Sequence, residues 1–155
     1  MAFETKIKRA RFVVGPFSPE QMAAIGQVTL DHIMERIRRG VNVQDAPAKR
    51  LSFDRRGSYG RLKVRKGLQP IRDWTFSGAT LHALKVKSAN ENRVVLGFID
   101  PKADAIAHIN NLREKQFGLS PSDMEALRRV VAATRRQARV VRTTSDARPT
   151  GNLPV

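Results

Sequence analysis

Three histidines are the side chains of this sequence best suited to metal binding or proton transfer, and they are scattered as His32, His82 and His108. The chain has no cysteine, which excludes thiolate ligands, disulfides and a cysteine nucleophile. His108 follows Asp104 by four residues, so one helix face would hold both, but a zinc site needs three or four ligands. We therefore expect a hydrogen-bonded helix histidine at this position, no metal site and no cofactor.

Sequence motifs for phosphate binding or covalent catalysis do not occur. The chain lacks the GxxxxGK[ST] and GxGxxG loops and the GxSxG nucleophile turn. The glycines of RGSYGR (Arg56–Arg61) are expected to lie in a flexible turn with no following helix to bind an anion. The carboxylates are too few and too scattered to provide an acid–base pair. The sequence therefore predicts a protein that is not an enzyme, and a small hydrolase is the least favoured hypothesis.

Positive charge is the strongest feature of the composition. In 155 residues, 29 Lys and Arg face 14 Asp and Glu, for a net charge of +15, and hydrophobic residues make up 41%. This length and composition fit one folded domain with a core, and no apolar stretch reaches the roughly 20 residues of a membrane span. Such a chain attracts polyanions or acidic proteins.

The charge is concentrated in a segment punctuated by Gly, Pro, Ser and Asn. From Lys49 to Lys66, eight bases and one acid give +7, and we expect an extended basic loop or loose hairpin at about residues 41–69. The candidate DNA- or partner-facing residues are Arg50, Arg55, Arg56, Arg61, Lys63, Arg65 and Lys66. Tyr59, with Phe53 nearby, is a poor stacking platform for single strands. Sequence-independent contact with duplex DNA and docking onto another protein both stay open.

A second basic segment is expected to be helical. Ser120-Pro121 is a helix start, and apolar residues then follow at helical spacing from Met124 to Val141. After Glu125 no acid occurs until Asp146. The candidate subunit-interface residues are Arg128, Arg135, Arg139 and Arg142, because guanidinium groups pair well with carboxylates across an interface.

The remaining elements predict a small sheet with helices. Ser18-Pro19 begins a long helix that Gly40 ends, and a short turn of helix is expected after Gly78. KVKS (Lys85–Ser88) and RVVLGFI (Arg93–Ile99) flank a polar turn as a hairpin. A further helix begins at Pro101, with an apolar face formed by Ile106, Ile109 and Leu112.

These elements give an α+β fold with a small antiparallel sheet, a long N-terminal helix, a C-terminal helix, the basic loop and terminal arms. Residues 1–142 are expected to form the single domain, including an N-terminal strand within residues 3–14. Residues 143–155 are expected to form a C-terminal arm, whose composition is typical of a disordered terminus that only partner chains would order.

Two stretches also resemble a known family. The first is DWTFSGATLHAL (Asp73–Leu84) followed by the hairpin strand that ends in Val95-Leu96-Gly97-Phe98, and the second is IAHINN (Ile106–Asn111) followed by FGLSPSD (Phe117–Asp123). In this order, after a long helix, they resemble the phage virion morphogenesis proteins, which include tail-completion and head–tail connector subunits. The resemblance spans roughly Pro19 to Arg136.

The resemblance implies a non-catalytic α+β subunit of a tailed-phage neck or tail. Such a subunit would form a homo-oligomeric ring that completes the tail or joins it to the head, with other neck, portal or tail proteins as partners. It would be found in the virion, and in the host cytoplasm during assembly, and non-specific contact with packaged double-stranded DNA would be compatible with its charge. The alternative is a basic nucleic-acid-binding protein without catalytic activity.

Overall fold

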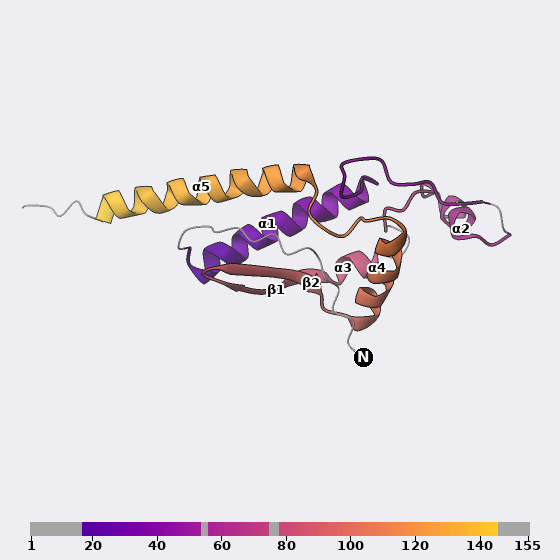
Figure 1. Cartoon of the computed structure of the whole chain (residues 1–155), viewed down its shortest axis with the longest axis horizontal. Helices are drawn as coiled ribbons and strands as arrows, with labels where there is room; N and C mark the ends of the chain where they lie inside the picture. The colour runs from indigo at the N-terminus through magenta and orange to yellow at the C-terminus, as the bar shows by residue number, and fades with distance from the viewer. Residues whose placement is uncertain (1–16, 54–55, 75–77, 146–155) are drawn as a thin grey trace, which may run out of the picture.

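The structure is a computed structural model that describes residues 17–53, 56–74 and 78–145, with side chains as far as residue 137. The elements run in the order α1, α2, α3, β1, β2, α4 and α5 (Figure 1). The α+β class, the long N-terminal helix, the antiparallel sheet and the C-terminal helix are as predicted. The predicted strand within residues 3–14 lies outside the described residues.

Helix α1, Pro19–Arg38, is the centre of the fold. Its first turn is fixed by Ser18, whose hydroxyl accepts from the Gln21 N–H while the Gln21 side chain accepts from the Ser18 N–H. Leu30, Ile33 and Ile37 are buried on one face. The helix therefore has both a defined start and a continuous apolar stripe to pack.

Strands β1, Leu84–Asn90, and β2, Arg93–Phe98, form the predicted antiparallel hairpin, with Leu84 opposite Phe98 and a bulge between Val86 and Ser88. The hairpin covers one side of α1, and α5 lies along the other side, so α1 is sandwiched between them (Figure 1). A two-stranded hairpin is marginal alone, and packing against α1 supplies the missing burial.

Helices α3, Ala79–His82, and α4, Pro101–Arg113, close the end of this sandwich near Leu84 and Phe98. Phe117, which follows α4, packs against the rings of Trp74 and Phe98, with centroids 4.8 and 5.1 Å apart. These aromatic contacts complete the main core around the C-terminal half of α1.

Helix α5, Pro121–Ser145, is longer than predicted, because it continues past residue 142 into the segment expected to begin the C-terminal arm. Its Leu127, Val130 and Val131 pack against a second core cluster of Phe17, Met22 and Ile25. Beyond this contact the helix extends past the N-terminal end of α1 (Figure 1).

The basic loop is the main departure from the prediction. Helix α2, Tyr59–Arg65, begins within RGSYGR, two residues after Gly57 and with Gly60 in its first turn, although no helix was expected to follow these glycines. We define the arm as residues 49–72: it leaves and rejoins the body through a bridge between Arg50 and Ile71, and it carries α2 at its far end (Figure 1). The segment is thus a folded projection.

Candidate interaction surfaces

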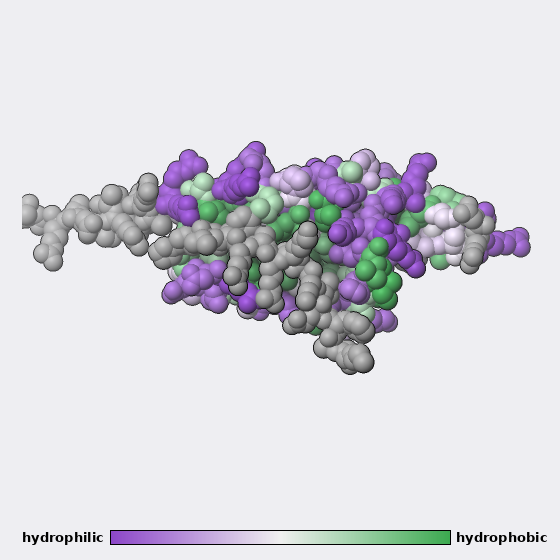
Figure 2. Space-filling model, in the orientation of Figure 1, coloured by the Kyte–Doolittle hydropathy of each residue, from purple (hydrophilic) through white to green (hydrophobic). Residues whose placement is uncertain are grey.

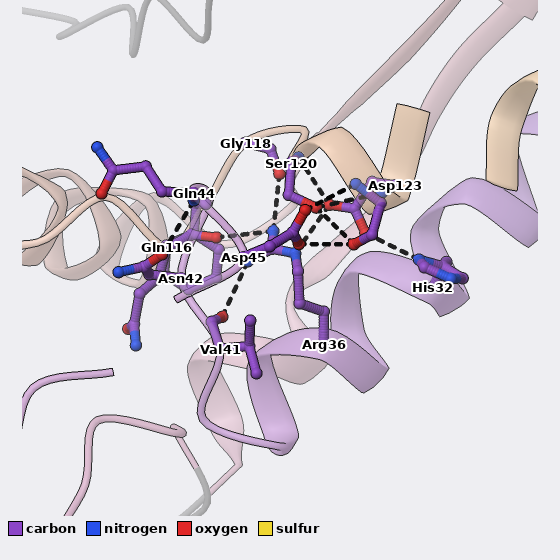
Figure 3. Close-up of polar contacts among 12 residues, drawn as sticks. His32, Arg36, Val41, Asn42, Gln44, Asp45, Gln116, Gly118, Ser120 and Asp123 are labelled. Carbon is purple, nitrogen blue, oxygen red and sulfur yellow. Dashed lines mark hydrogen bonds and ion pairs between the residues drawn. The ribbon is translucent and has the colours of Figure 1, made fainter. Parts of the chain in front are cut away.

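A buried carboxylate, Asp123, joins the two long helices (Figure 3). Its Oδ2 accepts a hydrogen bond of 2.8 Å from Arg36 Nε, and its Oδ1 lies 2.8 Å from His32 Nδ1. The side chain of Asp123 is 0% exposed and that of Arg36 is 1% exposed. A charge pair this deep is retained only when its remaining hydrogen-bonding groups are satisfied.

Arg36 meets that condition through three backbone carbonyls. Its guanidinium donates to the oxygens of Val41, Gln116 and Gly118 at 3.0, 3.1 and 2.9 Å (Figure 3). The first carbonyl follows α1, and the other two precede α5. The Arg36 side chain therefore fixes the end of α1 against the start of α5. Its ion-pair partner, Asp123, lies 87 residues further along the chain.

The start of α5 is held by two further contacts. Ser120 and Asp123 cap it reciprocally: the Ser120 N–H donates to Asp123 Oδ2 at 3.0 Å, and the Asp123 N–H donates to Ser120 Oγ at 3.1 Å. Asp45, which adopts a φ of 58°, accepts from the Ser122 N–H at 2.8 Å and from its hydroxyl at 2.6 Å. Burial acts to raise the pKa of Asp45, but the hydrogen bonds from Ser122 and Ser120 and the charge of Arg36 outweigh it, so the pKa is lowered.

A second buried ion pair holds the arm. Lys63 Nζ donates to Asp73 Oδ1 and, at 2.7 Å, to the carbonyl of Ile71. The prediction that Lys63 faces DNA or a partner is therefore wrong, because its side chain is 0% exposed. The Lys63 side chain points inward and pairs with the Asp73 carboxylate. This ion pair attaches α2 to the base of the arm.

Gln116 ties the base of the arm to the α4–α5 connection. It is fully buried; its side-chain oxygen accepts from the Trp74 indole N–H, and its amide donates to the carbonyl of Arg72. Asn111 in turn accepts from the backbone N–H groups of Gln116 and Phe117 at 2.8 and 3.0 Å. The C-terminal end of the arm is thus fastened to the body by the side chain of Gln116.

The other basic residues proposed for the arm lie on its surface, apart from Arg55, which is outside the described residues. Arg61 Nε donates to the carbonyl of Phe53 at 2.9 Å. The exposed basic residues are Arg50, Arg56, Arg61, Arg65 and Lys66. Burial raises the pKa of Tyr59 above its usual value, with a further increase from Asp73 and an opposing effect of Arg72, so its hydroxyl stays protonated at neutral pH.

Helix α5 presents the arginines proposed for a subunit interface. Arg128 and Arg135 are exposed. Arg139 and Arg142 lie in the helix, but their side chains are outside the described part of the chain. Neighbouring Arg129 pairs with Glu125 at 3.2 Å across the helix surface. The structure thus separates two basic surfaces, one on the arm and one on α5.

The apolar face predicted for α4 points away from the core. Ala103 and Ala107 are buried instead, while Ile106, Ile109 and Leu112 are 37%, 53% and 76% exposed. With Ile99, which is 64% exposed, they form what we call the α4 stripe. Apolar surface gathers over α4 in Figure 2. Exposed apolar side chains gathered in this way form a candidate interaction surface.

No protein-family model, curated protein or solved structure compared with the chain matches it.

The described residues contain no group of three His, Cys, Asp or Glu side chains placed to hold a metal ion. No helix among them has the length and apolar character to cross a membrane. His32, which the sequence offered only as one of three scattered histidines, lies in the Asp123 contact, and Arg36 was not proposed as a site residue. The only available signal was the Ser120-x-x-Asp123 spacing, which indicates a helix cap but does not indicate a partner on α1.

Proposed function

We propose that this protein is a non-catalytic structural subunit of a tailed-phage neck or tail. Copies would assemble side by side into a ring that completes the tail or joins it to the portal side of the head. Its partners would be further copies and other neck, portal or tail proteins, in the virion and, during assembly, in the host cytoplasm.

The observation that carries this proposal is the α4 stripe. Ile99, Ile109 and Leu112 are each more than half exposed on one side of the molecule, so a subunit alone leaves apolar surface in water. Burying such surface against another protein is favourable by about 25 cal/mol per Å². A ring needs two different surfaces to meet head to tail, and the arm supplies a second exposed apolar set in Phe53, Leu62 and Val64.

The placement of the family-like motifs supports the same proposal. The Asp73–Phe98 stretch ends in α3 and the hairpin, and the stretch from Ile106 to Asp123 covers α4 and the capped start of α5. The second segment contains three residues of the α4 stripe, Ile106, Ile109 and Leu112, and the start of α5, where Asp123 pairs with Arg36 of α1. The resemblance therefore lies on the part of the molecule that carries the exposed apolar surface and the buried contacts that position it.

The test is the oligomeric state of an Ile109→Asp/Leu112→Asp variant by native mass spectrometry and light scattering. The wild-type chain should give a defined oligomer, and the variant should shift to monomer at the same concentration, since two buried carboxylates would oppose association. Both substituted side chains are exposed, so the monomer fold should persist by circular dichroism.

Val28→Asp is the matched control, because Val28 is an isolated exposed apolar residue on α1. It should leave the oligomer intact. A wild-type protein that stays monomeric at high concentration and is absent from assembled particles would contradict the proposal.

A second candidate is a basic nucleic-acid-binding protein without catalytic activity, which the exposed arginines of the arm and α5 favour. It predicts that duplex DNA binding falls steeply with salt. Wild-type protein that stays monomeric yet binds duplex with a steep salt slope would favour this candidate over the ring.

A further inference from the structure

A hollow of about 520 Å³ opens between the arm and the end of α4. The segment in which the arm returns to the body, at Arg72, lines it as well. It is lined by three arginines from three separate segments, Arg56, Arg72 and Arg113, and by the glycines and hydroxyl residues at the start of α2. Leu51 is the aliphatic residue of the lining. Sites for apolar small molecules are mostly hydrophobic, so this lining selects an anion.

Two of the three arginines of the hollow form no ion pair with the described residues, and the third, Arg72, pairs with Glu114. Within the described part of the chain, Arg56 and Arg113 form no hydrogen bond or ion pair, and both are exposed. Arg72 Nη1 lies 3.8 Å from Glu114 Oε2, which positions it without a hydrogen bond. Glu114 is otherwise engaged through Oε1, which accepts from the Lys49 N–H at 3.0 Å.

A polar group in the wall of the hollow also lacks a partner. The Ser58 hydroxyl is buried, and no described residue hydrogen-bonds to it. Buried hydroxyls normally find a partner. An oxygen atom held among the three guanidinium groups would provide an acceptor for this hydroxyl. Arginine forks bind phosphate oxygens in pairs, which suits the tetrahedral arrangement of a phosphate group.

We propose that this hollow binds a backbone phosphate of a double-stranded nucleic acid. The chain's net charge of +15 supplies the long-range attraction. Tyr59 is the one aromatic residue of the lining, so bases cannot be stacked in succession as single-strand binders require. This phosphate site rests on the second candidate function, binding of nucleic acid, and it does not require ring formation.

The test compares an Arg56→Gln/Arg113→Gln variant with wild type for binding to a short DNA duplex, measured by fluorescence anisotropy over a range of NaCl concentrations. The variant should bind about 10-fold or more weakly at moderate salt, because two charge-assisted contacts are lost. The slope of log K against log salt should become shallower by about one, because the contact with one phosphate is lost. Ser58→Ala should weaken binding by a smaller factor without changing the slope.

Lys85→Gln/Arg93→Gln is the matched control, since both residues are exposed on the hairpin, away from the hollow, and it removes the same charge. It should keep most of the affinity. Equal losses in the two double variants would mean diffuse attraction and would overturn the proposed site, as would unchanged binding after removal of Arg56 and Arg113. Light scattering of the same samples reports the oligomer separately, so failure of the phosphate site is distinguishable from failure of the ring.

Discussion

Single side chains decide how the two projecting parts of this molecule are attached. Asp123 accepts hydrogen bonds from Arg36 and from the N–H of Ser120 and contacts His32, while Lys63 donates to Asp73 at the base of the arm. Both pairs are buried. Removing one member of such a pair leaves the other charge buried without a partner.

Asp123→Asn should therefore lower the free energy of unfolding by about 3 kcal/mol, at the lower end of the range for a broken buried pair because the amide oxygen still accepts one hydrogen bond. Urea denaturation followed by circular dichroism measures this. Asp31→Asn is the control: Asp31 is exposed and accepts only from the Gln27 amide, so the change should stay below about 0.5 kcal/mol. Equal effects of the two substitutions would show that the burial of Asp123 is unimportant.

Asp45 gives a prediction for acid pH. Its folded-state pKa is lowered from 3.8, so its contribution to stability is fully present above about pH 5 and is lost as the pH falls through and below the ordinary value. Asp45→Asn should flatten the fall of the urea midpoint between about pH 5 and about pH 3. If wild type and variant lose stability in parallel over this interval, the Ser122 hydrogen bonds do not depend on the charge of Asp45.

Residue roles of this kind were the hardest to predict from the sequence. Arg36 was one of several basic residues in the last turn of a helix, and Lys63 was one of eight bases in a loop. What distinguishes each is a carboxylate brought to it by the fold, 87 residues away for Arg36 and 10 away for Lys63. No local spacing rule reports such a partner.

At the scale of elements, the contact between α1 and the hairpin depends on Gly26. A Cβ at this position would lie 2.5 Å from Val94 Cγ1 and 3.4 Å from Val86 Cγ2. The strands therefore approach the helix more closely than any larger residue would allow. The helical propensity that alanine would add, about 1 kcal/mol, is smaller than the cost of overpacking at this distance, about 1–3 kcal/mol.

Gly26→Ala should thus destabilise the protein, by about 1 kcal/mol or more in urea denaturation. In a Val94→Ala background the same substitution should be close to neutral or stabilising, because the obstructing methyl groups are gone. A double-mutant cycle measures this coupling, which we expect to exceed about 1 kcal/mol. Simple additivity of the two substitutions would contradict the close approach.

Element boundaries with chemical signals were predicted well. Ser18-Pro19 and Ser120-Pro121 mark helix starts that the structure contains, and Arg93 begins the second strand as expected. The orientation of α4 was wrong because size, as well as hydrophobicity, decides which side is buried: Ala103 and Ala107 permit the close packing of that end of the fold. Helix α2 was missed because its glycine-rich start is typical of turns.

At the scale of the whole molecule, the excess of positive charge destabilises the folded state. The chain has a net charge of +15, and among the described residues the two fully buried bases, Arg36 and Lys63, are paired with carboxylates. Mutual repulsion between the exposed bases raises the free energy of the folded state, while buried pairs are screened little by salt.

Raising NaCl from about 20 mM to about 500 mM, which shortens the screening length several-fold, should therefore raise the urea midpoint. The measurement is made at one protein concentration, with the oligomeric state checked at both salt levels so that association does not mimic the effect. A midpoint that falls with salt would mean that exposed attractive pairs, such as Arg129 with Glu125, outweigh the repulsion.

The contact at Asp123 holds α5 near its start, while the other end of the helix projects from the body (Figure 1). The helix is clamped to α1 near its start and through Leu127, Val130 and Val131, and its remaining turns project. The part of α5 beyond Val131 is about 21 Å long, so a tilt of about 5° at the last packing contact displaces the far end by about 2 Å. A molecule bound at that end would therefore be positioned by the ion pair and the apolar contacts that set the angle between α5 and α1.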